Sequence, residues 1–230
     1  MCDRNENGGV DNRHIDNSEL SLQDCQSIFT PTFIQQLKTM FMCGNLGDPI
    51  IAKDTLEVFD YFRQHNANMW LSMNTNAGAK NVEWWQELAK TIGKKGAVIF
   101  SVDGLSDTNH LYRQNVVWDN VERNMRAFID AGGRARWDFI IFGHNEHQVD
   151  EAQQLAEAWG VERFQLKKSA RFFTANSERK QVHQARNRKG EQTQVIAEPT
   201  KKENKNLALQ RTNDCLLYTS PSPRDLSTAR

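Results

Sequence analysis

The strongest indication of the fold is the stretch AVIFSVDG at residues 97–104, where an apolar, β-rich run ends in polar side chains and a glycine. Two earlier apolar runs end similarly, in MCGNLGDP at residues 42–49 and in MNTNAG at residues 73–78. A segment with helix-like spacing of apolar residues follows each run. In a barrel of parallel strands such endings all face one mouth, where ligands bind. The small polar residues there predict a site for a polar cofactor.

The alternation of strand and helix continues to residue 167. This order predicts an α/β fold, a partial (β/α) TIM-like barrel of about five parallel strands joined by right-handed crossovers. A doubly wound sheet is the alternative, but its site usually gathers at one switch point. Polar residues here end several consecutive strands. The predicted strands cover residues 38–43, 69–73, 97–102, 136–142 and 163–167, and the predicted helices cover residues 54–65, 82–92, 118–131 and 146–159.

The length of 230 residues, 38% of them hydrophobic, suffices for one sizeable domain with an appendage. Ser21 and Asp24 predict a capping box for a short helix that begins at Leu22. The end of the chain resembles translated vector sequence rather than evolved protein. The predicted organisation is a loop over residues 1–20, a partial barrel over 21–173, a polar, basic and disordered linker over 174–214, and a non-native tail over 215–230.

The formal net charge is zero, so the charge of the whole chain does not indicate nucleic acid or an acidic membrane as a partner. Residues 167–211 nevertheless carry twelve Lys and Arg against four Glu, so a phosphate-rich partner is the alternative to a solvated linker. No run approaches the roughly 18 apolar residues of a membrane span, and the polar start does not resemble a signal peptide. The four cysteines contain no C-x-x-C pair, and a cytoplasmic protein with reduced thiols is expected.

The first candidate site residues are Gly44, Gly47 and Asp48. Glycine allows the backbone to approach a ligand closely, and the Asp48 carboxylate could hold an ammonium group. The alternative is an ordinary turn between strand and helix, in which Asp48 and Pro49 serve only the turn.

The second and third strand ends add further candidates. Asn74 and Asn76 can hydrogen-bond a ribose or a carboxylate, or can instead form an Asx-turn that caps the next helix. Ser101 and Asp103 alternate along the chain and are predicted to share one face. Arg113 carries a planar fork suited to a carboxylate, although a surface salt bridge would explain it equally well.

A group of polar residues follows the fourth predicted strand. His144, Glu146 and His147 lie close together in the sequence, which suggests a metal site, but they span the junction between a strand and a helix. Asn145 is better explained as the N-cap of the next helix, with Glu146 in its first turn. A metal site here is therefore not the favoured interpretation.

Taken together, these residues resemble the radical S-adenosylmethionine (radical SAM) superfamily, and within it the SPASM/twitch type that often modifies peptides or proteins. Residues 47–49 resemble the Gly-Glu-Pro element, with Asp48 in place of Glu. Residues 74–78 resemble the Thr-Asn-Gly element, with Ala77 inserted. Residues 101–104 resemble the Ser-hydrophobic-Asp-Gly element, and Arg113 matches an arginine that reaches the cofactor carboxylate.

The resemblance also implies a 4Fe–4S cluster, held in the family by a C-x-x-x-C-x-x-C motif that this chain does not contain. Cys2 matches the third cysteine of that motif, which makes Cys2 the expected metal ligand. The chain is therefore expected to be a fragment, truncated at its amino terminus and inactive by itself. Cys25 and Cys43 are expected to pack as small apolar side chains rather than replace the missing ligands.

For the intact parent, the resemblance implies reductive cleavage of S-adenosylmethionine at the cluster to give a 5′-deoxyadenosyl radical. The implied partners are a peptide or small-molecule substrate and a reducing electron donor such as flavodoxin or ferredoxin. The implied cofactor-binding residues are Gly44, Gly47, Asp48, Asn74, Asn76, Ser101, Asp103 and Arg113, and the residues bordering the adenine are Asp138, Ile140, Lys167 and Lys168.

Two other functions fit the same sequence. An iron-free βα-barrel lyase or aldolase would need a catalytic lysine or acid pair at a strand end, for which Lys167 is the obvious candidate. A non-enzymatic module would use the basic residues 167–211 to bind nucleic acid or membrane, with strong salt dependence.

Overall fold

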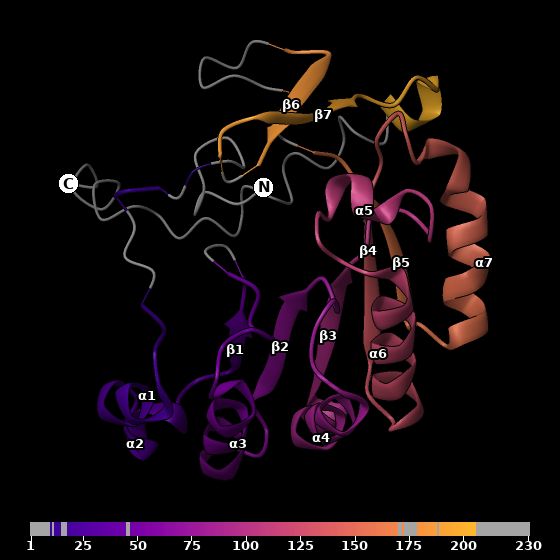
Figure 1. The fold of residues 1–230 in the computed structure, drawn as a ribbon. Helices are drawn as coiled ribbons and strands as arrows, with labels where there is room; N and C mark the ends of the chain where they lie inside the picture. The colour runs from indigo at the N-terminus through magenta and orange to yellow at the C-terminus, as the bar shows by residue number, and fades with distance from the viewer. Residues whose placement is uncertain are drawn as a thin grey trace, which may run out of the picture.

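The computed structural model describes residues 10, 12–14, 18–44, 47–169, 172, 179–187 and 189–205. Its centre is a five-stranded sheet in which each strand pairs in parallel with the next along the chain (Figure 1). The strands are β1 (Thr39–Met42), β2 (Trp70–Thr75), β3 (Gly96–Ser101), β4 (Ala135–Ile140) and β5 (Arg163–Lys167). This arrangement confirms the predicted α/β class and the five parallel strands.

The strand order β1-β2-β3-β4-β5 also distinguishes the two architectures that the sequence left open. A doubly wound sheet reverses its strand order at a switch point, and the described sheet has no reversal. Helices that follow β1, β2, β3 and β4 lie along one side of the sheet (Figure 1), as in part of a barrel. They are α3 (Thr55–His65), α4 (Val82–Ile92), α6 (Trp118–Asp130) and α7 (Val149–Trp159), with shorter helices α1 (Leu22–Ile28), α2 (Pro31–Ile34) and α5 (Asn109–Tyr112).

Local sequence signals position these helices. The Ser21 hydroxyl accepts a hydrogen bond from the Asp24 amide at 3.1 Å, and the Asp24 carboxylate accepts one from the Ser21 amide at 2.9 Å, which confirms the capping box. The side chain of Asn81 accepts from the Trp84 amide at 3.1 Å and so begins α4.

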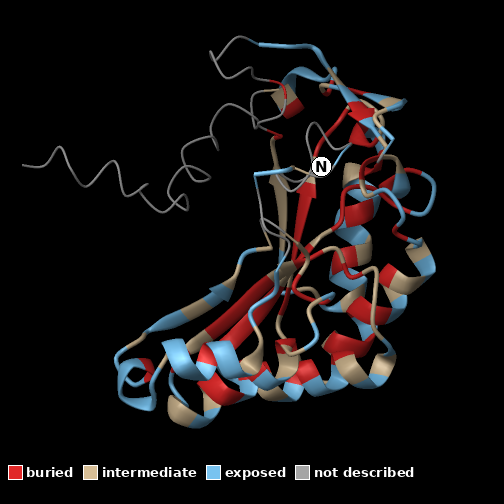
Figure 2. Cartoon of the chain, turned by 60° about the vertical axis from the view of Figure 1, so that its left-hand side comes forward, coloured by how far each residue is buried: buried red, intermediate tan, exposed pale blue. Residues whose placement is uncertain are grey.

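The main core lies between the helices and the sheet (Figure 2). Trp85 of α4, Phe100 of β3 and Phe128 of α6 are fully buried and in mutual contact, with ring centroids 5.7 to 6.4 Å apart. Aromatic burial of this kind contributes most of the stability of a small domain. The core therefore holds the strand ends in fixed positions relative to one another.

Residues 174–213 were expected to contain little packed structure, and the described part of this segment corrects that expectation. Strands β6 (Val182–Arg186) and β7 (Gln192–Ala197) form an antiparallel hairpin. Its Ile196 packs into a second buried cluster with Tyr112, Phe142 and Phe172, which explains why so polar a segment can fold. The other domain boundaries stay predictions, and the predicted tail over 215–230 lies outside the described residues.

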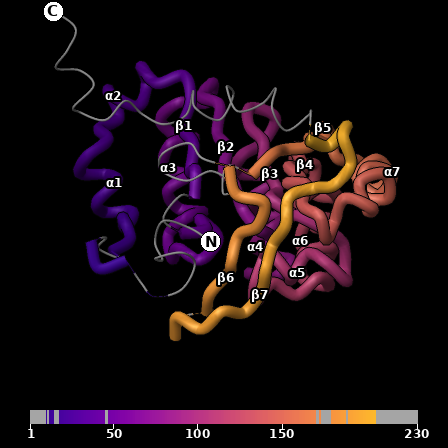
Figure 3. The backbone as a smooth tube through the Cα atoms, turned by 90° about the horizontal axis from the view of Figure 1, so that it is seen from above, coloured from indigo at the N-terminus to yellow at the C-terminus, as the bar shows by residue number. Residues whose placement is uncertain are grey.

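The hairpin lies over the end of the sheet at which the strands terminate (Figure 3). The Gly143 amide donates to the Ala197 carbonyl at 2.9 Å. The Glu146 carboxylate accepts hydrogen bonds from the amides of Thr200 at 2.9 Å and Lys201 at 3.1 Å, and from the Asn204 side chain at 3.3 Å. Glu146 therefore anchors the chain that follows β7.

Asn145 also differs from its expected role. Its side chain makes no hydrogen bond that caps the following helix. It accepts instead from the Phe142 amide at 2.7 Å and donates to the carbonyls of Asp103 and Ile140, both at 2.9 Å. Asn145 thus joins the loop after β3 to the end of β4, because these carbonyls have no strand partner beyond the sheet.

Among the described residues, none of the helices combines the length and apolar character that crossing a membrane requires.

The Glu146 anchor predicts an acid-sensitive hairpin. Although burial opposes ionisation, the donors on Thr200, Lys201 and Asn204 lower the pKa of Glu146 from 4.5 to about 2. Because the folded pKa is lowered, the stabilisation is fully present above a pH of about 4.5 and is lost as the pH falls toward 2. Glu146→Gln should speed hydrogen exchange in β7 by an amount equivalent to about 1–3 kcal/mol, and should leave β1–β5 unchanged.

The matched control is Glu151→Gln, because Glu151 is exposed on α7. Equal exchange rates in β7 for both variants and the original chain at neutral pH would show that Glu146 does not anchor the hairpin.

Candidate functional site

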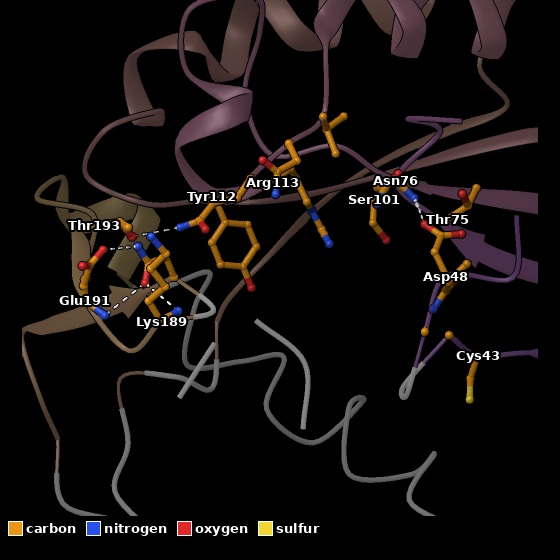
Figure 4. A pocket seen from close by; sticks show the side chains of 17 residues that line it. Cys43, Asp48, Thr75, Asn76, Ser101, Tyr112, Arg113, Lys189, Glu191 and Thr193 are labelled. Atoms are coloured by element: carbon orange, nitrogen blue, oxygen red, sulfur yellow. Dashed lines mark hydrogen bonds between the residues drawn. The ribbon is translucent and has the colours of Figure 1, made fainter. Parts of the chain in front are cut away.

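A cavity of about 840 Å³ opens at the carboxyl ends of β1, β2 and β3. Figure 4 shows Cys43, Asp48 and Ser101 at one side, Lys189, Glu191 and Thr193 at the other, and Arg113 and Tyr112 between them. The lining residues are Cys43, Gly44, Gly47, Asp48, Asn74, Thr75, Asn76, Ser101, Tyr112, Arg113, Gln114, Asn115, Val116, Asn187, Lys189, Glu191 and Thr193.

The predicted candidates therefore share one cavity, with one exception. Seven of the eight cofactor-binding candidates line it, and Asp103 is not among the lining residues. The remaining candidate, the metal ligand Cys2, lies outside the described residues.

Asp48 connects the loop after β1 to the end of β2. Its carboxylate accepts a hydrogen bond from the Asn76 amide at 2.7 Å and another from the Ile50 amide at 3.2 Å. Burial raises the pKa of Asp48, although these amides and the charge of Arg113 favour the ionised form. The carboxylate is thus held rigidly at the cavity wall, where a cationic group of a ligand would offset the cost of its burial.

The glycine loop beside Asp48 is tightly folded. Gly44 has a φ of +68°, and a Cβ atom there would lie 3.1 Å from the Gly47 carbonyl oxygen and 3.2 Å from the Pro49 ring. A larger residue at position 44 would therefore displace this wall of the cavity.

The side chains after β2 combine a turn with a cavity wall. The Asn76 side chain accepts from the Gly78 amide at 2.8 Å, which is the Asx-turn that the sequence offered as the alternative to ligand binding. Asn74 and Asn76 nevertheless both line the cavity. The two interpretations are therefore compatible.

Arg113 and Asp103 form an ion pair at the base of the cavity. The Arg113 Nε donates to Asp103 at 2.6 Å, and the other Asp103 oxygen accepts from the Ile140 amide at 2.6 Å. Asp103 is completely buried, whereas the side chain of Arg113 is 24% exposed and lines the cavity. Burial opposes the charged guanidinium, but the Asp103 carboxylate raises the pKa of Arg113. Arg113 is therefore a cation held in one position. Because Asp103 does not line the cavity, it can act on a ligand only by positioning Arg113.

The separation of Ser101 from Asp103 has a structural reason. The two were expected to share a face, but β3 ends at Ser101, so strand alternation stops there. Gly104 has a φ of +140° and turns the chain away from the sheet. Asp103 consequently pairs with Arg113 without lining the cavity, whereas Ser101 lines it.

The hairpin supplies the side of the cavity that sequence reasoning missed. Asn187, Lys189, Glu191 and Thr193 line it, and the Gln114 side chain donates to the Thr193 hydroxyl at 3.2 Å. The sequence did hold a signal for this hairpin, because Asn187 and Gly190 are typical turn residues between two short β-prone runs. The polar composition of the segment obscured it.

The residues expected to border an adenine are placed differently. Asp138, Ile140, Lys167 and Lys168 are not among the described residues that line the cavity. Lys167 forms an ion pair with Asp138. An aldolase lysine must reach the substrate carbonyl to attack it, and Lys167 is not among the described residues that line the cavity. This placement weighs against the aldolase alternative.

The described residues do not fit an iron–sulfur cluster. They contain no group of three His, Cys, Asp or Glu side chains placed to hold a metal ion. The two described cysteines lie apart in the fold, Cys25 buried on α1 and Cys43 exposed at the end of β1. Cys25 packs in the core as expected. The same expectation for Cys43 is wrong, because Cys43 is exposed and lines the cavity.

The chain was compared with known proteins. No family model matches it, and no curated protein matches it. Among solved structures, SuiB of Streptococcus suis bound to S-adenosylmethionine is similar with a TM-score of 0.55 and 17% identity, over 67% of this chain and 34% of that one. Native anSMEcpe with bound AdoMet is similar with a TM-score of 0.56 and 14% identity, over 75% of this chain and 50% of that one.

These neighbours are radical SAM enzymes. The chain shares the fold of these structures. The resemblance seen in the sequence is thus confirmed at the level of the fold. A third structure, SuiB bound to precursor peptide SuiA, matches with a TM-score of 0.55, 18% identity and 74% of this chain. The chain spans 34% to 50% of the length of these three radical SAM structures.

The Arg113–Asp103 ion pair predicts that the nearly isosteric substitution Asp103→Asn strongly lowers the free energy of unfolding. Asp103→Asn removes the negative charge and leaves the partly buried guanidinium of Arg113 without its counter-ion. Loss of one partner of a buried pair costs about 3–5 kcal/mol. Urea denaturation should therefore show a decrease of that order in the free energy of unfolding.

Asp130→Asn serves as the control, because Asp130 is exposed on α6 and should change stability by no more than about 0.5 kcal/mol. An Asp103→Asn variant as stable as this control would contradict the assigned role of the pair.

Proposed function

We propose that this chain is part of a radical SAM enzyme and that its cavity binds S-adenosylmethionine. The observation that carries the proposal is the opposed pair of charges in one cavity, with the Asp48 carboxylate on one element and the Arg113 guanidinium on another. Such a pair complements the ammonium and the carboxylate of an amino acid. The volume of about 840 Å³ lies within the range of small-molecule sites.

The residues of the cavity fit S-adenosylmethionine with divided roles. Asp48 would accept hydrogen bonds from the ammonium group, beside the backbone of the glycine loop at Gly44 and Gly47. Arg113 and Ser101 would hold the carboxylate, with Asp103 keeping the guanidinium in place. Asn74 and Asn76 would lie near the ribose or the substrate.

When bound, S-adenosylmethionine supplies the sulfonium bond that radical SAM enzymes cleave reductively to obtain a 5′-deoxyadenosyl radical for hydrogen abstraction. The chain's own contribution is binding and orientation of the cofactor. The half-buried carboxylate of Asp48 and the ion pair of Arg113 are fixed before a ligand arrives. A site organised in this way loses little entropy on binding.

The remaining parts of the proposal concern the larger protein. A peptide substrate is supported by the neighbour solved with a precursor peptide. A reducing electron donor such as flavodoxin or ferredoxin and a cytoplasmic location follow from the proposed chemistry. The 4Fe–4S cluster would need thiolate ligands beyond those in the described residues, with Cys2 as one of them.

The charge pair predicts how the cavity binds its cofactor. Asp48→Asn should weaken binding of S-adenosylmethionine about tenfold or more, because it removes a charged hydrogen-bond acceptor. Because the pKa of Asp48 is raised, affinity should fall on acidification at a higher pH than an ordinary aspartate would give. Asp48→Asn should abolish this pH dependence. Isothermal titration calorimetry measures both effects.

The matched control is Asp60→Asn, because Asp60 is exposed on α3 away from the cavity. The proposal fails if S-adenosylmethionine does not bind the original chain, or if the Asp48 and Asp60 variants bind it equally well.

The sequence also predicts the result of cluster reconstitution. The chain contains no C-x-x-x-C-x-x-C motif, so anaerobic incubation with iron and sulfide should give no stable 4Fe–4S species by visible absorption. A stoichiometric cluster that responds to S-adenosylmethionine would overturn the expectation that this chain is inactive by itself.

A further inference from the structure

We propose that the turn of the β6–β7 hairpin forms the substrate side of the cavity, and that Lys189 binds a carboxylate of an acidic substrate peptide. This inference rests on the proposed function, because it assigns the strand-end side of the cavity to S-adenosylmethionine. It concerns the opposite side, which Asn187, Lys189, Glu191 and Thr193 supply (Figure 4).

The hairpin turn is organised before any ligand binds. The Asn187 side chain accepts from the amides of Lys189 at 2.9 Å and Glu191 at 3.0 Å. The same side chain donates to the Glu191 carboxylate at 2.8 Å. Gly190 has a φ of +82°, which a glycine adopts without strain. These contacts hold Asn187, Lys189 and Glu191 together at the cavity wall.

The hairpin is also fixed relative to the strand ends. The Gln114 side chain donates a hydrogen bond to the Thr193 hydroxyl at one side of the cavity. The Gly143 amide donates one to the carbonyl of Ala197, the last residue of β7. Glu146 holds the chain that follows. The two sides of the cavity consequently face each other at a set separation, as a site for two ligands requires.

The polar side chains of the cavity differ in whether they have a hydrogen-bond or ion-pair partner within the chain. The Glu191 carboxylate accepts a hydrogen bond from the Asn187 side-chain amide, and the Thr193 hydroxyl accepts one from the Gln114 side chain. The Arg113 guanidinium forms an ion pair with Asp103. Within the described residues, no carboxylate forms an ion pair with Lys189 and no acceptor takes a hydrogen bond from its ammonium group. Lys189 is exposed, so water solvates that group in the open cavity.

A ligand that fills the cavity displaces this water. An exposed cation that loses part of its water without gaining a counter-charge carries a free-energy cost. A substrate with a carboxylate beside Lys189 offsets that cost, whereas a neutral amide of the same shape does not. Lys189 therefore favours an acidic peptide.

The test compares two short fluorescein-labelled peptides, one with two glutamates and one with glutamines in their place. Fluorescence anisotropy with the full chain and S-adenosylmethionine should show the glutamate peptide binding about fivefold tighter, as for a partly exposed ion pair. Lys189→Ala should remove this preference, Lys189→Glu should reverse it, and Lys189→Arg should keep it. Lys202→Ala is the control, because Lys202 is exposed beyond β7 and does not line the cavity.

The inference is overturned if the original chain binds neither peptide, binds both equally, or keeps its preference after Lys189→Ala. Calorimetry of the original chain with S-adenosylmethionine separates this result from the proposed function, because it measures cofactor binding with no peptide present. If the cofactor fails to bind while the Lys189-dependent preference persists, the proposed function fails and the peptide subsite remains.

Discussion

The buried carboxylate of Asp103 is the constraint on which the site depends. It is completely buried and joins two elements, through the Arg113 guanidinium and the Ile140 amide, each at 2.6 Å. The cost of burying a charge is offset only when its partners are in place. The loop after β3 must therefore adopt the geometry that puts Arg113 at the base of the cavity. Asn145 supports the same loop from the end of β4.

Opposite Arg113, the fold builds a second charged position from independent contacts. Asp48 is held by backbone amides at the ends of the first two strands. Because parallel strands end at one edge of the sheet, the segments that follow β1, β2 and β3 bring these positions together. The hairpin then closes the far side, held by Glu146 and by Ile196 in its own apolar cluster. The fold thus positions the cavity from elements that lie far apart in the sequence.

Much of the barrel could be predicted from local pattern. The bounds of α4 at Val82–Ile92 and of β5 at Arg163–Lys167 agree with the predicted ranges, because caps and apolar periodicity act over a few residues. The hairpin could not be predicted this way, since burial of Ile196 depends on Tyr112 and Phe142, which are distant in sequence. The position of Asp103 was missed for a similar reason, because only the structure shows that β3 ends at Ser101. Asp48, Ser101 and Arg113 line one cavity, as expected for residues that follow parallel strands, and their role in binding stays a prediction.

We propose that these strand ends bind S-adenosylmethionine by its amino-acid group, and a crystal structure of the chain grown with S-adenosylmethionine would test this binding directly. The ligand carboxylate should lie within hydrogen-bonding distance of Arg113 and Ser101, and its ammonium should lie beside Asp48. A ligand bound outside this cavity, or one whose amino-acid group contacts neither Asp48 nor Arg113, would contradict it.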